Sequence, residues 1–152
     1  MTQTLNSMSW ANCKIELSDD AGVNWRDISG FSNSVSVDGG ERATAEFFTA
    51  DGGTPIITAG KRSAIEVGVK AVYTEDATFA PFIMAQTAYD NHTLLQLRWS
   101  PKGGSIGQFR FTTAQGYCTK PVLPTGAADS SDAIPVELTL KVASITKSTI
   151  SV

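Results

Sequence analysis

Alternation of apolar and polar residues dominates the chain and predicts a protein built mainly of β-strands. The clearest case is residues 64–73, where every second residue is apolar and Glu66, Gly68 and Lys70 occupy positions between them. Residues 134–142 alternate in the same way. A period of two places one face of a strand in a core and the other toward solvent. Both segments are therefore predicted to be half-buried strands.

Shorter or weaker alternation recurs along the rest of the chain and predicts further strands. The segments are 11–17, 23–28, 34–37, 93–99, 108–113 and 116–122. Leu95, Leu97 and Trp99 share one face of their segment. Phe109 and Phe111 share a face of theirs and are predicted to point inward. With the two clear cases, the chain is expected to contain about seven or eight strands.

One segment departs from this period and predicts the single good helix of the chain. From Thr78 to Tyr89 the spacing of larger side chains changes to a repeat of 3.6 residues. The residues on this repeat are Phe79, Phe82, Ile83, Gln86 and Tyr89. Thr78 is predicted to be the N-cap, with Pro81 in the first turn. One such helix is too little to cover a parallel sheet, so the strands are predicted to be antiparallel.

The predicted fold is therefore mainly β: an antiparallel two-sheet sandwich, barrel-like, with one flanking helix. The 152 residues are expected to form a single domain spanning 1–152, which is large enough to bury a core without disulfides. Residues 144–152 are interpreted as a short C-terminal tail rich in Ser and Thr.

The segment 39–62 is the feature that this fold leaves unexplained. Loops longer than about 12–15 residues are uncommon in compact domains unless they have a function. Strand-like residues lie on both sides of an Asp-Gly-Gly sequence at 51–53, which predicts an extended hairpin that leaves the body. The apolar residues of this hairpin have little of their own fold to bury against, and exposed apolar groups commonly mark a partner surface. The alternative is that the hairpin folds back and belongs to the sandwich.

Composition and charge narrow the class of protein. The net charge is −3 with a pI near 5.0, and the 12 Lys and Arg residues are scattered along the chain. A nucleic-acid-binding protein normally shows a basic footprint, so specific DNA or RNA binding is not expected. The N-terminus lacks the charged start and apolar run of a secretion signal, and no stretch approaches a membrane span. The chain is therefore expected to be made and kept in a cytoplasm, or assembled into a particle there. In such a reducing compartment Cys13 and Cys118 are expected to be free thiols.

Catalytic chemistry finds little support in the sequence. A phosphate-binding P-loop needs four residues between its first Gly and Gly-Lys-Ser/Thr, whereas six separate Gly53 from Gly60 and Lys61 is followed by Arg62. The one histidine, His92, has no ligand or nucleophile partner at a typical spacing and is interpreted as a cation at the helix end. No catalytic, cofactor-binding or metal-binding residue is predicted, and no cofactor is expected.

Acidic pairs and aromatic residues also have ordinary structural explanations. Asp19 and Asp20, like Asp129 and Asp132, are interpreted as solvated turns rather than cation sites. The aromatic residues follow the apolar faces of the predicted strands and helix and are assigned to the core. A Ser-His-Asp triad stays open in principle, because such residues meet only in space.

Three stretches resemble the tail tube (major tail) proteins of long-tailed bacteriophages. They read GFSNSVSVDGGERATAEFFTADGGTPIITAGKRSAIEVGVKAVYTE, LQLRWSPKGGSIGQFRFTT and PVELTLKVASITKST. The resemblance covers most of the chain, from about Trp25 to Thr149, and rests on pattern because no catalytic motif defines the family. It implies a two-sheet sandwich with one helix, assembled into hexameric rings that stack into a hollow tube in the virion tail. It also implies other tail proteins as partners and a long loop that reaches neighbouring subunits, here at 39–62.

The inter-subunit contacts are accordingly expected on the hairpin. The candidate residues are Glu41, Arg42, Glu46, Phe47, Phe48, Asp51, Ile56, Ile57, Lys61 and Arg62. Lys61 and Arg62 lie where the hairpin rejoins the body. They are predicted to contact carboxylates of a neighbouring subunit rather than phosphate, and Arg62 is the better candidate because its guanidinium can bind a carboxylate through two hydrogen bonds.

Two further arguments agree with a tube. A mildly acidic subunit would let DNA pass transiently without holding it, because it offers few cations to phosphate. An antiparallel sandwich also has unpaired edge strands that a ring can join between neighbours. The lumen is predicted to be lined either by the Glu66 and Lys70 face or by the Gln96 and Arg98 face.

Other functions stay open at this point. A sandwich carrying Trp25 and Trp99 could be a glycan- or receptor-binding module of a tail tip or head decoration. The same fold class also serves contractile tails and type VI-like injection machines. An enzyme is the weakest of these hypotheses, because the sequence shows no group of polar residues expected to converge on one site.

Overall fold

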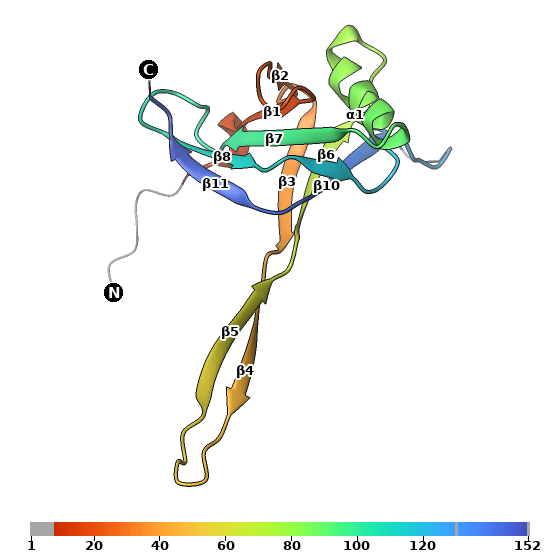
Figure 1. Ribbon diagram of the computed structural model, residues 1–152. Helices are drawn as coiled ribbons and strands as arrows, with labels where there is room; N and C mark the ends of the chain where they lie inside the picture. The colour runs from red at the N-terminus through yellow and green to blue at the C-terminus, as the bar shows by residue number, and fades with distance from the viewer. Residues whose placement is uncertain (1–7, 130, 152) are drawn as a thin grey trace.

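Antiparallel strands make up most of the protein. A computed structural model describes residues 8–129 and 131–151. Its elements, in chain order, are η1 (Trp10–Asn12), β1 (Lys14–Ser18), β2 (Arg26–Asp27), β3 (Ser32–Gly39), β4 (Arg42–Phe47), β5 (Ile56–Arg62), β6 (Ile65–Val72), η2 (Ala77–Phe79), α1 (Ala80–Asp90), β7 (Leu94–Ser100), β8 (Phe109–Thr113), β9 (Gly116–Cys118), β10 (Pro135–Val142) and β11 (Ile145–Thr149). The expectation of a mainly β protein with one flanking helix is confirmed (Figure 1).

Strand β7 joins two sheets into one sandwich-like body. Its first residues, Leu94 and Leu95, pair with β9, and β9 continues through β10 and β6 to β3. Its last residues, including Arg98 and Trp99, pair with β8, which pairs with β11. Strand β1 lies on the other side of β7 and carries β2. Every one of these pairings is antiparallel, as the alternation predicts.

The core lies between the inward faces of these sheets and under α1. Strands β6 and β10 pair over their whole length, from Pro135 opposite Val72 to Val142 opposite Ile65. Both contribute every second residue to the core, as predicted. The fully buried large side chains of the core include Leu17, Ile28, Val67, Val69, Phe82, Leu95, Leu97, Leu138 and Leu140.

The helix region packs Phe79, Phe82 and Tyr89 of the predicted stripe against the core, but not Ile83. Helix α1 begins at Ala80 after the 3-10 turn η2, so Thr78 lies inside that turn and is not the N-cap. Phe82 is buried against the rings of Phe31 and Phe79, as expected. Ile83, however, is 61% exposed. Beside Phe82 the helix rests on Ala85 and Ala88, whose small side chains allow it to approach the body closely.

Several strands begin or end at other residues than the pattern predicts. The first begins at Lys14, because residues 10–12 form a 3-10 turn that Ser9 caps. Its return partner is reduced to Arg26–Asp27, since the preceding residues form a turn. The weak strand at 116–122 contains only Gly116–Cys118. The sequence predicts no strand at 144–152, yet Ile145–Thr149 pairs with β8 and forms an edge of the sheet.

Phe109 is also placed differently from the prediction. It lies on the same face of β8 as Phe111, but it is 51% exposed because that end of the sheet extends beyond the core. Phe111 is half-buried and stacks on Trp99 with 5.7 Å between ring centroids. Lys147 of β11 covers the Phe109 ring, with Nζ 3.7 Å from the ring centroid.

No helix in the described part of the chain is long and apolar enough to cross a membrane. The first seven residues of the N-terminal segment, Ser130 of the polar loop and the last residue lie outside the described residues, as does the side chain of Thr78.

Candidate functional site

A two-stranded arm projects from the body and is the outstanding feature of the molecule (Figure 1). Strands β4 and β5 pair only with each other, in a small sheet separate from the nine-stranded one. Their register sets Phe47 opposite Ile56 and Glu46 opposite Ile57. At about 3.3 Å per residue, the six residues of β4 alone extend about 20 Å. The predicted extended hairpin is therefore present and does not fold back onto the sandwich.

Two glycines separate the arm from the body. The arm continues the β3–β6 pair, because β3 runs into β4 through Gly39 and Gly40 and β5 runs into β6. Both glycines have positive φ, 80° and 77°. Gly40 also packs closely, since a Cβ there would lie 2.9 Å from Cγ1 of Ile65. Glycine is the residue that adopts this backbone without strain, so the pair redirects the chain where the core ends.

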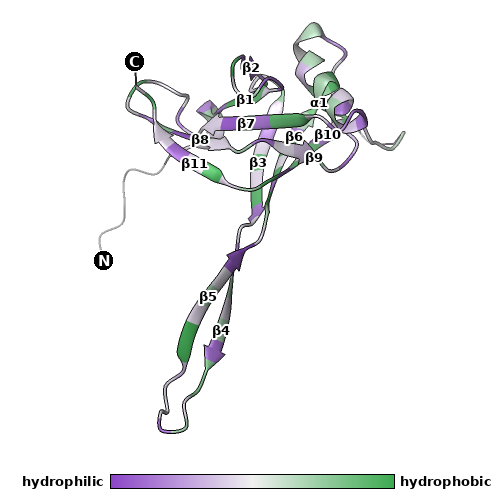
Figure 2. Cartoon of the chain, viewed as in Figure 1, coloured by the Kyte–Doolittle hydropathy of each residue, from purple (hydrophilic) through white to green (hydrophobic). Residues whose placement is uncertain are grey.

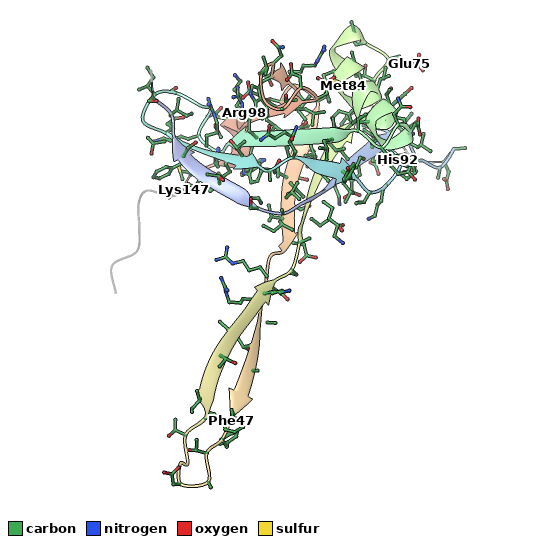
Figure 3. All side chains as sticks on the ribbon, viewed as in Figure 1. Phe47, Glu75, Met84, His92, Arg98 and Lys147 are labelled. Atoms are coloured by element: carbon green, nitrogen blue, oxygen red, sulfur yellow. The ribbon has the colours of Figure 1, made fainter. Side chains whose placement is uncertain are left out.

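The far half of the arm carries large apolar side chains that no other described part of the subunit covers. Phe47, Phe48, Ile56 and Ile57 are between 53% and 67% exposed. The register places Phe47 and Ile56 on one face of the ribbon and Ile57 on the other. Figure 2 shows a hydrophobic stretch on the lower part of β5, and Figure 3 places Phe47 near the far end of the arm.

Charge is divided along the arm. Its base carries the three cations Arg42, Lys61 and Arg62 with one carboxylate, Glu41, and the far half carries Glu46 and Asp51. Arg42 lies opposite Arg62 and donates a hydrogen bond to the carbonyl of Gly60 at 3.1 Å.

These cations have no carboxylate partner within the described chain. None of the three forms an ion pair with another described residue. Together with Glu41 they surround a shallow hollow at the base of the arm. The arm thus combines uncovered apolar groups with cations that are free to pair outside the subunit.

The two predicted lumen faces lie in different surroundings. Glu66 and Lys70 are exposed on the outer face of β6, opposite Lys141 and Glu137 of β10. Gln96 and Arg98 instead make contacts within the subunit. The Gln96 amide donates to the carbonyl of Thr113 at 2.8 Å.

Arg98 belongs to a partly buried ionic cluster that sequence reasoning missed. Its Nε lies 2.6 Å from Oε2 of Glu16, and its guanidinium lies over the Trp25 ring. Lys14 contacts the other carboxylate oxygen at 3.0 Å. Burial raises the pKa of Glu16, but the hydrogen bonds and charges of Arg98 and Lys14 outweigh it, so this pKa lies below its ordinary value. The polar position of Glu16 in an alternating strand indicated an exposed residue, whereas it is buried.

The remaining predicted residues take structural positions. Cys13 and Cys118 are both free, and burial raises the pKa of Cys13 to about 11. Asp20 forms a tight turn, accepting hydrogen bonds from Asn24 and Ser18. His92 adopts a positive φ of 55° directly after the helix C-cap. The described residues include no cluster of three or more His, Cys, Asp or Glu side chains able to hold a metal ion.

Comparison with solved structures identifies the fold. A chain of the SPP1 tail tube aligns with a TM-score of 0.69 at 14% identity, over 95% of this chain and 80% of that one. A chain from the tail of an empty gene transfer agent particle, computed with C6 symmetry, gives 0.67 at 10% identity over 95% and 100%. A chain of the PVC sheath–tube complex, an extracellular contractile injection system, gives 0.65 at 15% identity over 96% and 94%.

This chain has the tail-tube fold. No family model and no curated protein matches its sequence. The tail-tube fold therefore emerges from the arrangement of strands, helix and arm, while sequence identity to these neighbours stays at 15% or below.

Proposed function

We propose that this protein is a structural subunit that self-assembles into stacked, hexameric rings, which form the hollow tail tube of a phage and conduct its DNA. The observation that carries the proposal is the arm. The arm exposes apolar side chains and unpaired cations, and this exposure brings no benefit to a free monomer. The chain that carries the arm has the tail-tube fold. The role is structural, with assembly in the host cytoplasm, a place in the virion tail and other tail proteins at the tube ends.

One solved neighbour and two features of the chain support this proposal. The C6 symmetry of the gene transfer agent tail supports rings of six. Strands β3 and β11 end the sheet path and leave edges that neighbours can pair with. The net charge of −3, repeated around each ring, favours passage of DNA over retention.

Glu66 and Lys70 are the better candidates for the lumen, because Arg98 is engaged by Glu16 within the subunit.

The arm residues 39–62 provide the inter-subunit contacts in this proposal. Arg62 and Lys61 pair with carboxylates of a neighbour, for which Glu41, Glu46 and Asp51 of another arm are the first candidates. A single exposed ion pair contributes only about 0–1 kcal/mol, but a tube repeats it in every subunit.

Electron microscopy of the purified chain tests the proposal. Rings or tubes are expected, whereas isolated particles at all concentrations would rule out self-assembly. Arg62→Glu is expected to weaken polymerisation in a sedimentation assay while leaving the fold intact. Lys120→Glu is a matched control, because Lys120 is exposed and follows β9 of the body, outside the arm. Equal sedimentation of Arg62→Glu and the parent would remove the ion-pair role.

A contractile injection system is the second candidate, since the PVC and anti-feeding prophage assemblies also contain this fold. Immunogold labelling of native particles with antibodies against this chain separates the two. Label along tails attached to DNA-filled heads supports a phage, and label on headless sheathed particles supports an injection system.

A further inference from the structure

An apolar hollow at the far end of the body has the features of a receptor for the arm. It measures about 340 Å³ and lies on the inner face of β8 where the sheet extends beyond the core. Met8, Phe109 and Phe111 line it, together with Lys102. Ile106, in the adjoining loop, is 69% exposed.

The charge around the hollow is positive. Lys102 belongs to its lining, and Lys147 covers the Phe109 ring from the neighbouring strand. No acidic residue is among the described residues that line the hollow. The hollow and the cations beside it therefore expose apolar and positively charged groups to solvent.

The far half of the arm has the complementary character. Phe47, Phe48 and Ile57 supply exposed apolar surface, and Glu46 and Asp51 supply negative charge. An aromatic side chain in an apolar pocket, with opposite charges at the rim, is the usual composition of a strong contact. The arm of the same chain cannot be the occupant, because it runs away from the body (Figure 1).

We propose that the tip of the arm docks into the Phe109 hollow of a second copy of this chain, with Glu46 and Asp51 near Lys147 and Lys102. Of the three arm carboxylates, Glu41 then remains as the partner for Arg62 and Lys61 of a neighbour. This inference rests on the proposed function, because it names the surface that the assembly arm binds. Lys147 then exchanges part of its contact with the Phe109 ring for a carboxylate of the incoming arm.

Disulfide trapping tests the contact directly. In a Cys13→Ser background, one chain carries Phe48→Cys and another carries Ile106→Cys. Mixing and oxidation are expected to give a covalent dimer of the two chains on a non-reducing gel. The matched control replaces Ile106→Cys by Ile134→Cys, which is also exposed but lies directly before β10, and it should give no dimer.

A charge exchange tests the same contact without cysteines. Lys147→Glu is expected to raise the critical concentration for polymerisation about tenfold, which corresponds to about 1.4 kcal/mol. Adding Glu46→Lys should restore most of the loss, while Lys120→Glu alone should have no effect.

The outcomes separate this inference from the function on which it rests. If the parent chain forms no rings or tubes, the proposed function fails. If tubes form but Phe48→Cys links no better to Ile106→Cys than to Ile134→Cys, and Lys147→Glu assembles normally, the arm docks elsewhere. The inference is then wrong while the tube proposal stands.

Discussion

The long hairpin from β3 to β6 passes through two environments, and the contrast explains how the molecule divides its tasks. In the body, β6 pairs with β3 on one side and β10 on the other, and its Val67 and Val69 are fully buried in the core. In the arm, Ile56 and Ile57 of β5 belong to the same hairpin, but they are 53% and 65% exposed, and no other sheet of the described chain packs on the ribbon. The same kinds of side chain therefore stabilise the subunit in one half and remain available for a partner in the other.

The boundary between the two regions is set by few residues. Gly39 and Gly40 redirect the backbone at the point where the pairing of β6 with β10 ends, at Ile65 opposite Val142. Beyond them the ribbon has backbone hydrogen bonds but no core, and a two-stranded ribbon alone is marginally stable in water. The body should thus account for nearly all of the unfolding free energy of the monomer.

The largest expected effect lies in the body, at the helix. Phe82→Ala should reduce the free energy of unfolding by about 3–5 kcal/mol, because Phe82 is 1% exposed and its removal leaves a cavity among aromatic rings. Ile83→Ala, one position along, is the matched control and should change it by less than about 0.5 kcal/mol. Denaturant unfolding of the monomer measures both. Equal effects from the two variants would mean that the helix packs on a different face.

A pair of substitutions within the long hairpin compares its two halves directly. Val67→Ala should cost about 2 kcal/mol of unfolding free energy, since it removes fully buried methyl groups. Ile57→Ala should leave that free energy within about 0.5 kcal/mol of the parent but weaken polymerisation. Thermal unfolding of monomers and sedimentation of polymers provide the two readouts. A stability loss from Ile57→Ala that matches Val67→Ala would show that the arm packs on its own body.

A smaller effect is expected from the ionic cluster. Glu16→Gln should cost about 1–2 kcal/mol at neutral pH, because Arg98 loses a charged acceptor in a partly buried position. The pKa of Glu16 lies below its ordinary value of 4.5, so its contribution is present above that value and is lost as the pH falls below it.

Unfolding measured from pH 7 downward checks the Glu16 prediction. The difference in stability between the parent and Glu16→Gln should narrow below about pH 4.5. A difference that is independent of pH would indicate that the substitution acts through packing and not through charge.

The smallest effect on the monomer should come from the arm itself. Amide hydrogen exchange is expected to be fast at residues 41–58 in the free subunit, where the ribbon lacks a core, and slow in the polymer. Residues 65–72 of β6 serve as an internal reference and should be protected in both states. Strong and equal protection of the arm in both states would contradict the division between arm and body.

Much of the body could be predicted from the sequence, for a simple physical reason. Strands with one buried face need apolar residues at every second position, and this requirement is visible along β6, β7 and β10. The hairpin could be predicted as well, since its glycines, its Asp-Gly-Gly tip and its length are local features. Whether the apolar residues of the hairpin are exposed depends on what packs against them. Their exposure could therefore be learned only from the tertiary structure.

Other features depend on contacts between distant parts of the chain. Glu16 is buried because it meets Arg98 from a strand far along the sequence, and no local pattern reports such a meeting. Ile83 is exposed and Ala85 is buried because the body lies against the small side chains of the helix. Ile145–Thr149 has little strand pattern of its own and is held by its pairing with β8. The sequence by itself determined which segments could form a half-buried strand or an arm. The tertiary structure decided which apolar and charged side chains are buried, because the elements that bury them come together only in the fold.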